Sequence, residues 1–233
     1  MDINNYFDRI FVLNLEKRLD RKEKMINKLN KAGITNYEFI KAIDGSVEPY
    51  LSIYNYKLKY NGFFEPPGAL GILLTAYKIL MYSKTKKYKK ILILEDDAIF
   101  HKDFENNFNK KILNIPDWKL LYLGTSINSI RLNKCLPKNN INFITSIGTI
   151  TGAFGIGIDS SIFDELIFYI KNTNKPWDIG PLREINVKYH DKVIIIYPYL
   201  IICDTIDSNL RESISLKNTA SRCSWNINNY DYS

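Results

Sequence analysis

The fold of this chain is decided by one stretch, Lys89-Lys90-Ile91-Leu92-Ile93-Leu94-Glu95-Asp96-Asp97-Ala98-Ile99-Phe100. Two lysines lead into an apolar run, and that run ends in three consecutive carboxylates. A continuous apolar run with β-branched residues predicts a strand that is buried on both faces of a sheet. Open α/β sheets bind ligands just beyond the carboxyl ends of their strands. The sequence therefore places an acidic triplet where such a fold has its ligand site.

The three adjacent carboxylates repel one another, and burying them without compensation costs several kcal/mol. A divalent cation would offset that cost, and hard oxygen ligands suit Mn²⁺ or Mg²⁺. Because side chains alternate along an extended strand end, we expect Glu95 and Asp97 on one side and Asp96 on the other. The pattern predicts a metal held by Glu95 and Asp97. A solvated acidic turn is the alternative interpretation of the triplet.

The composition is that of a folded domain with a sizeable core. Of the 233 residues, 45% are hydrophobic and 24% are charged. The formal net charge of +7 is compatible with nucleic acid, an anionic membrane surface or phosphorylated substrates as partners. The lysines and arginines are scattered along predicted helices, however, which favours solvated helix faces over a nucleic-acid interface.

Cysteine and histidine usage indicates neither a disulfide framework nor a zinc site. The three cysteines and two histidines lie far apart in the sequence. The N-terminal residues contain no basic region followed by an apolar segment, so no signal peptide is predicted. No apolar run reaches the ~20 residues that cross a bilayer. We therefore expect a soluble protein in the cytoplasm, either its own cell's or that of a host.

Strand and helix patterns alternate along most of the chain. Period-2 or continuous apolar runs predict strands, in addition to the one above, at residues 10–13, 37–43, 118–124 and 192–198. Helical spacing of apolar residues predicts helices between an Asp20 cap and Gly33, over 70–81, over 103–113 and from Ser160. The tyrosine-rich segment up to Tyr60 has no clear prediction. This alternation predicts one α/β domain with a mostly parallel central sheet flanked by helices.

Two groups of residues near predicted helix starts are candidates for anion binding. Arg18 and Arg21 precede or open a helix, where a cation opposes the helix dipole, so a phosphate or the acidic triplet is a candidate partner. Ordinary surface charge is the alternative. Gly68 and Gly71 would let backbone N–H groups approach an anion. Close packing against a neighbouring element is the commoner cause of such glycines.

The second half of the chain has two further candidate features. Glycines interrupt the apolar pattern over residues 143–158, which indicates a bulge or the close approach of a ligand. The turn at residues 175–181 presents one carboxylate, Asp178, and Pro181 is predicted to open the next helix. Asp178 is a candidate catalytic base, with capping of that helix as the alternative. The tail after Arg211 is rich in Ser and Asn and is predicted to be partly mobile.

Several ordered segments resemble glycosyltransferase family 25, which includes lipooligosaccharide sugar transferases and collagen hydroxylysine galactosyltransferases. The segments are residues 11–21, 68–71, 93–97, 118–124 with 148–149, and the closing 207–210. The resemblance implies a GT-A-type, Rossmann-like domain over residues 1–210. Residues 211–233 would then form a C-terminal tail, either mobile or packed as a lid.

The resemblance also implies an activity and a set of site residues. The activity is an inverting, metal-dependent transfer of a hexose from a UDP-sugar donor to a hydroxyl of a glycan or protein acceptor. Mn²⁺ or Mg²⁺ would be held by Glu95, Asp97 and Asn209. The partners would be the donor and the acceptor, and no nucleic acid is expected. The residues expected to bind the donor are Leu15, Arg18, Arg21, Ala42, Asp44, Gly68, Gly71 and Asp96.

Two positions depart from the family pattern. Thr75-Ala76 stands where the family commonly has Ser-His, and Asn209 stands where it has aspartate. If that aspartate is a metal ligand, Asn209 binds metal more weakly, or Asp204 or Asp207 substitutes for it. A degenerate nucleotide-sugar-binding relative without turnover therefore remains an alternative. A metal-dependent nucleotidyl or phosphoryl transferase is a second one, because paired carboxylates also serve that chemistry.

Overall fold

The structure is a computed structural model, and it describes residues 2–62, 65–127, 132, 142–145, 148, 150–206 and 214–232. Its centre is a seven-stranded sheet with the strand order β2-β1-β3-β7-β5-β8-β6. The strands of this sheet are β1 (Arg9–Asn14), β2 (Tyr37–Lys41), β3 (Lys90–Glu95), β5 (Leu120–Tyr122), β6 (Phe143–Thr145), β7 (Gly155–Asp159) and β8 (Val193–Ile196).

The sheet is mostly parallel, as the sequence predicts. Strand β1 pairs in parallel with β2 and β3, and β5 pairs in parallel with β8. Strand β7 is antiparallel to both β3 and β5, so these two point the same way, while β6 is antiparallel to β8. The carboxyl ends of β1, β2, β3, β5 and β8 therefore meet at one edge of the sheet.

The organising strand β3 is buried on both faces, as its continuous apolar run predicts. Ile91, Leu92 and Leu94 have no exposed surface and Ile93 is 2% exposed. Each such side chain contributes roughly 1.5–3 kcal/mol by leaving water. Strand β1 is buried in the same way over Ile10, Phe11 and Val12, so two central strands carry much of the core.

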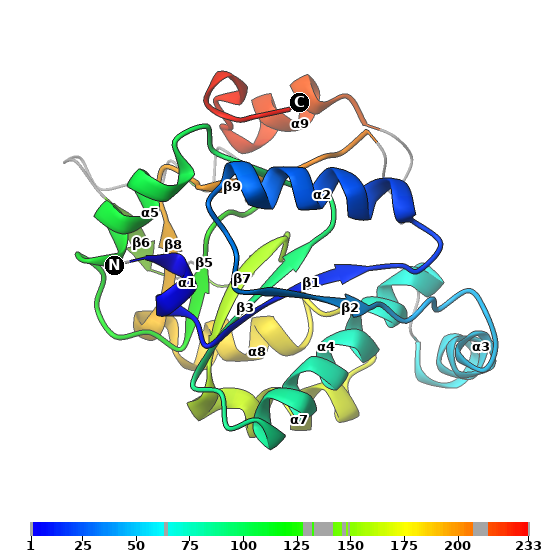
Figure 1. The fold of residues 1–233 in the computed structure, drawn as a ribbon. Helices are drawn as coiled ribbons and strands as arrows, with labels where there is room; N and C mark the ends of the chain where they lie inside the picture. The colour runs from blue at the N-terminus through cyan, green and yellow to red at the C-terminus, as the bar shows by residue number, and fades with distance from the viewer. Residues whose placement is uncertain are drawn as a thin grey trace.

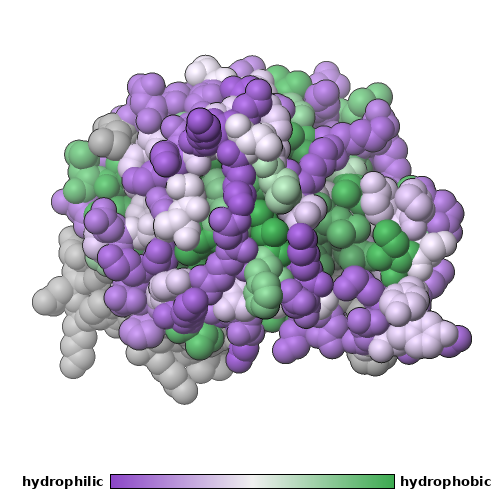
Figure 2. Space-filling model, turned by 90° about the horizontal axis from the view of Figure 1, so that it is seen from below, coloured by the Kyte–Doolittle hydropathy of each residue, from purple (hydrophilic) through white to green (hydrophobic). Residues whose placement is uncertain are grey.

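Helices cover both faces of this sheet (Figure 1). Helix α2 lies on one face, and α4, α7 and α8 lie together on the other. Seen from the α4 and α7 side, the surface is mostly hydrophilic with small hydrophobic patches (Figure 2), as expected for solvated helix faces. The helices are α1 (Ile3–Tyr6), α2 (Leu19–Lys31), α3 (Tyr50–Asn61), α4 (Pro67–Thr85), α5 (Phe104–Ile112), α7 (Phe163–Asn172), α8 (Pro181–Lys188) and α9 (Leu216–Cys223).

Most predicted helices are present, with some differences at their ends. Asp20 was predicted to cap α2, but the helix begins at Leu19 with Arg18 at the N-cap, and Asp20 lies inside the first turn. The other end is as predicted, because Gly33 has φ +70° and stops the helix. Pro181 opens α8 as predicted. The tyrosine-rich segment without a prediction forms α3, which has no fully buried residue and therefore no strong periodic signal.

The glycine-interrupted segment from 143 to 158 contains two strands, β6 and β7, that lie in different places in the sheet. The antiparallel direction of β7 was not predicted, because periodicity reports which residues are buried but not which strand is the neighbour. Close packing accounts for one of the glycines in this segment, Gly157. A Cβ there would lie 3.0 Å from the Phe7 ring and 3.1 Å from the Trp118 ring, so glycine permits close packing on the sheet.

A second, two-stranded sheet connects the acidic turn to the end of the chain. Strands β4 (Ala98–Phe100) and β9 (Ile201–Cys203) pair antiparallel, with Ala98 opposite Cys203. The Asp204 N–H then donates to the carbonyl oxygen of Asp97 at 2.8 Å. Strand β9 was not predicted, since three residues are too short to show a period. It places Cys203 and Asp204 beside the acidic turn.

The described part of the C-terminal tail is anchored by buried aromatic residues. Trp225 is 5% exposed and its Nε1 donates to the Thr125 carbonyl oxygen at 3.0 Å. Tyr230 is 4% exposed and its hydroxyl donates to the Tyr199 carbonyl oxygen at 2.8 Å. These two anchors hold α9 on the same side of the molecule as the acidic turn. None of the described helices combines the length and apolar character that a membrane span requires.

Candidate active site

A cavity of about 460 Å³ lies at the carboxyl edge of the parallel strands. Its size is in the range of sites for small molecules and cofactors. The walls come from the ends of β1, β2 and β3, the start of α4, the turn before β7, the turn before α8, and the segment after β9. Residues of the C-terminal tail complete the wall on one side, namely Ile214, Thr219 and Arg222.

The cavity collects most of the residues that the sequence proposed for a site. Its lining includes Leu15, Arg21, Ala42, Asp44, Gly68, Glu95, Asp96, Asp97 and Asp178. These residues come from loops that are far apart in the sequence. The segments after β1, β2 and β3 meet at the same edge of the sheet, and Gly68 in α4 and Asp178 in the turn between α7 and α8 reach that edge from helical segments. Asn209 lies outside the described residues.

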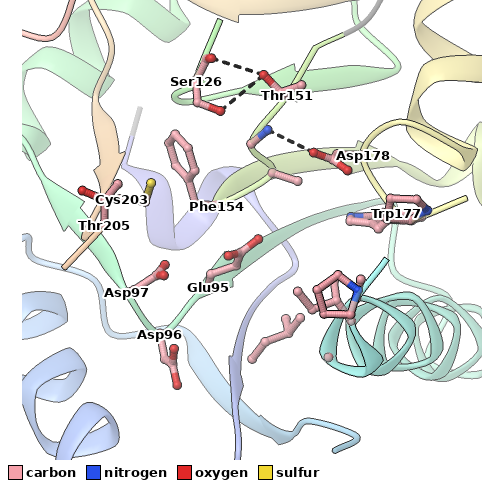
Figure 3. A pocket seen from close by; sticks show the side chains of 18 of the residues that line it. Glu95, Asp96, Asp97, Ser126, Thr151, Phe154, Trp177, Asp178, Cys203 and Thr205 are labelled. Carbon is pink, nitrogen blue, oxygen red and sulfur yellow. Dashed lines mark hydrogen bonds between the residues drawn. The ribbon is translucent and has the colours of Figure 1, made fainter. Parts of the chain in front are cut away.

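The carboxylates of the acidic turn point in the alternating directions that an extended strand end predicts. Glu95 and Asp97 are directed into the cavity, whereas Asp96 is directed toward α2 (Figure 3). Asp96 Oδ1 accepts from Arg21 Nη1 at 2.8 Å, and Asp96 Oδ2 accepts from Asn14 Nδ2 at 2.7 Å. Asp96 is therefore held by protein groups, and the two flanking carboxylates remain for a ligand in the cavity.

Burial and mutual repulsion make both cavity carboxylates hard to ionise. Burial raises the pKa of Glu95 well above its ordinary value, and the charges of Asp97 and Asp178 raise it further. Burial raises the pKa of Asp97 to about 7, although the nearby charges of Arg21 and Lys28 oppose that rise. A positive charge placed between Glu95 and Asp97 would reverse this effect, because it favours the ionised carboxylates.

Glu95 and Asp97 fit a divalent cation, both in the kind of ligand atom they offer and because one of their oxygens lacks a hydrogen bond among the described residues. Asp97 Oδ1 is buried and, among the described residues, has no hydrogen-bond partner, an arrangement that a bound cation would satisfy. Carboxylate oxygens are the donors that Mn²⁺ and Mg²⁺ prefer. The described residues do not contain a preformed group of three Asp, Glu, His or Cys ligands. Ligands beyond the two carboxylates would have to come from elsewhere.

Asp178 faces the same cavity from the turn before α8. Its Oδ2 accepts from the Gly152 N–H at 3.3 Å, and its Oδ1 accepts from the N–H of Ile179 at 2.9 Å. The turn is fixed by Trp177, which is 4% exposed, and by a 2.8 Å bond from the Gly180 N–H to the Pro176 carbonyl oxygen. Asp178 is thus oriented toward the cavity rather than bonded to the start of α8.

Two residues proposed for donor binding do not line the cavity. Arg18 lies at the N-cap of α2, where its guanidinium bonds the carboxylate of Asp20 at 2.8 and 2.9 Å. Gly71 faces the loop after β2, and a Cβ on it would lie 2.2 Å from the Ile43 carbonyl oxygen. Of the two explanations for this glycine, the structure favours close packing. Arg21 does line the cavity, but it pairs with the acidic triplet through Asp96.

Several lining residues were missed by the sequence reasoning. Ser126, Thr151 and Phe154 line the side of the cavity beyond Glu95, and Ser126 and Thr151 bond each other through their hydroxyls at 3.3 Å (Figure 3). The density of glycines before β7 was the available signal for this wall. Arg222 had no signal, because it lies in a tail with no recognisable motif.

A mostly parallel α/β sheet with an acidic turn and a cavity at its carboxyl edge is the arrangement of a GT-A-type, Rossmann-like transferase domain. The chain belongs to glycosyltransferase family 25, because the sequence model of that family, described as glycosyltransferase family 25 (LPS biosynthesis protein), matches residues 7–179. The family resemblance drawn from the short motifs is therefore confirmed.

Individual relatives match about half of this chain. A candidate glycosyltransferase of Acanthamoeba polyphaga mimivirus is 32% identical over 135 residues, which are 54% of this chain and 40% of that protein. Procollagen galactosyltransferase 2 of Homo sapiens is 29% identical over 131 residues, 51% of this chain and 21% of that protein. Inactive glycosyltransferase 25 family member 3 of Homo sapiens is 28% identical over 130 residues, which are 51% of this chain and 22% of that protein. The chain therefore spans less than half the length of these relatives.

Among solved structures, the chain is similar to a glycosyltransferase involved in glycosylation of the major capsid of PBCV-1. The TM-score is 0.43 with 10% sequence identity, and the match covers 82% of this chain and 81% of the other.

Proposed function

We propose that this protein transfers a hexose from a UDP-sugar donor to a hydroxyl group of a glycan or protein acceptor, with inversion at the anomeric carbon. The observation that carries the proposal is the convergence of Glu95 and Asp97 on one cavity, with a buried oxygen on Asp97 that has no hydrogen-bond partner in the described part of the chain. Such a pair suits a cation and the diphosphate that accompanies it. Family membership supports the same class of reaction.

In this proposal Glu95 and Asp97 hold Mn²⁺ or Mg²⁺. The ion would offset the negative charge that develops on the diphosphate as the sugar leaves. Arg21 and Asn14 keep Asp96 turned away, so that the other two carboxylates remain on the cavity side of the strand end. The nucleoside would occupy the more apolar end of the cavity, whose lining residues are Leu13, Leu15, Ala42, Ile43, Ala69 and Ile72.

Asp178 is the proposed base for the acceptor hydroxyl. A single displacement needs one group that removes the proton from the attacking oxygen. Asp178 lines the cavity, and its charge acts on Glu95, so the two carboxylates face a common space. The backbone N–H groups of Gly152 and Ile179 orient the Asp178 carboxylate within that space.

The decisive experiment is a donor screen with the purified chain, in which UDP release from UDP-sugars is measured with and without Mn²⁺. The Asp97→Ala variant is expected to lose metal-dependent release by at least a hundredfold. Asp103→Ala is a matched control, because Asp103 lies outside the cavity lining. Undiminished release by Asp97→Ala would overturn the metal assignment. Release of pyrophosphate from NTPs instead of UDP from UDP-sugars would favour a nucleotidyl transferase.

A nucleotide-sugar-binding protein without turnover is the second candidate. It is favoured by the presence of an inactive family member among the relatives and by the absence of a third preformed acidic ligand among the described residues. Calorimetry with UDP and Mn²⁺, followed by the turnover assay, separates the two candidates. Binding with no release from any donor would support the second.

A further inference from the structure

The cavity has more carboxyl groups than cationic side chains, and the proposed donor would bring further negative charge to it. Among the described residues that line it, seven are carboxylates and only two, Arg21 and Arg222, are cations. A nucleoside diphosphate adds further negative charge to this space. A divalent cation would offset part of it, and a protein cation at the cavity would offset more.

The two lining arginines are engaged differently. Arg21 forms the buried pair with Asp96, and its side chain is 8% exposed. Arg222 is exposed, and none of the ion pairs among the described residues includes it. Its guanidinium interacts with the thiol of Cys223, which is a weak hydrogen-bond acceptor. Arg222 can therefore offer its planar set of N–H donors to a ligand in the cavity.

The tail that carries Arg222 is fixed to the cavity wall. Thr205 and Ile214 exchange two hydrogen bonds, from Ile214 N–H to the Thr205 carbonyl oxygen at 3.1 Å and from Thr205 Oγ1 to the Ile214 carbonyl oxygen at 2.8 Å. Thr219 contacts Thr205 at 3.5 Å between hydroxyl oxygens. Thr219 and Arg222 are three residues apart, so they lie on one face of α9, and both line the cavity.

The far end of α9 is fixed as well. The Trp225 N–H donates to the Ala220 carbonyl oxygen at 2.9 Å, and the buried indole of Trp225 bonds the Thr125 carbonyl oxygen. Arg222 therefore projects from a short helix that is tied down on both sides. A guanidinium on such a support loses less conformational freedom on binding than one on a free tail.

From this arrangement we propose that Arg222 binds the diphosphate of the nucleotide-sugar donor, so that the C-terminal tail completes the donor site. The inference rests on the proposed function for the class of ligand. Arginine suits this role because its fork of N–H donors matches phosphate oxygens in a bidentate way. The tail would then contribute to affinity for the phosphates and not to recognition of the nucleoside.

The test is calorimetric titration of the full chain in MnCl₂ with UDP, uridine and inorganic pyrophosphate. The variant Arg222→Ala should bind UDP and pyrophosphate roughly ten- to a hundredfold more weakly, the range expected for a lost charged hydrogen bond. Its affinity for uridine should be unchanged, and Arg222→Lys should recover part of the loss. Lys217→Ala is the matched control, because Lys217 is an exposed cation on the same helix and does not line the cavity.

The outcomes separate this inference from the proposed function. Equal UDP affinity in Arg222→Ala and Lys217→Ala would overturn the role of Arg222 and leave the donor proposal standing. A uniform loss for UDP, pyrophosphate and uridine would also overturn it, since that pattern indicates a structural effect. If the unmodified chain binds pyrophosphate through Arg222 but not UDP, the nucleotide assignment fails and the phosphate role stands. If it binds neither, both proposals fail.

Discussion

Arg21 and Asp96 form a buried ion pair, with Nη1 and Oδ1 2.8 Å apart and side chains 8% and 10% exposed. The pair joins the first turns of α2 to the acidic turn after β3. It holds the middle carboxylate of the triplet on the α2 side, with help from Asn14. The pair therefore separates a structural carboxylate from the two that face the cavity.

Replacing one partner of this pair should be costly to stability. In Arg21→Met, Asp96 keeps its bond from Asn14 but loses its counter-charge, and breaking a buried pair costs about 3–5 kcal/mol of unfolding free energy. The partly exposed pair between Arg9 and Glu38 provides the control, because its side chains are 31% and 33% exposed and so remain in contact with water. Arg9→Met should cost about 0–1 kcal/mol. Urea unfolding measures both, and similar losses in the two variants would contradict the structural role given to Arg21.

Gly71→Ala should destabilise the protein although Gly71 is not at the cavity. A Cβ there would lie 2.2 Å from the Ile43 carbonyl oxygen and 3.1 Å from the Gly45 amide nitrogen, so the loop after β2 must move. Overpacking of this kind typically costs about 1–3 kcal/mol. Gly68→Ala, in the first turn of α4, is the comparison. We expect thermal unfolding to show a clear drop only for Gly71→Ala, and an equal effect would argue against the packing explanation.

The metal-free protein should lose stability as pH rises from about 4 through 7. The folded Asp97 carboxyl has its pKa raised to about 7, whereas an unfolded aspartate releases its proton near pH 3.9. Between these values the folded state binds more protons, so the free energy of unfolding decreases with pH and then levels off. Unfolding in EDTA across this range tests the slope. Glu95, whose pKa is also raised, adds to the same slope, so Asp97→Asn should make the slope shallower, and an unchanged slope would show that Asp97 does not contribute to it.

Asp178→Asn should abolish sugar transfer while donor binding is retained. The amide keeps an oxygen for the Gly152 N–H but cannot remove a proton from the acceptor. We expect a fall in turnover of about 10²–10⁴-fold, with UDP affinity within a few-fold of the unmodified chain. Asp164→Asn on the exposed face of α7 is the control. Joint loss of turnover and UDP binding in Asp178→Asn would indicate a structural role for the carboxylate.

The sequence determined the features that depend on local patterns. The apolar run before Glu95 specified a strand buried on both faces, and the period of two along its end specified that Glu95 and Asp97 share a side that excludes Asp96. The alternation of strands and helices specified the mostly parallel sheet. Each of these follows from the residues within a few positions, so no distant neighbour had to be known.

Tertiary structure alone decided which distant residues meet at the cavity. It inserted the antiparallel β7 between β3 and β5, which brings Phe154 to Glu95, and it returned the chain through β9 so that Arg222 of the tail lines the same cavity. It also packs Gly71 against the backbone of Ile43 and pairs Arg21 with Asp96. Such contacts depend on the pairing of strands and the packing of loops far apart in the chain, and local periodicity carries no information about either.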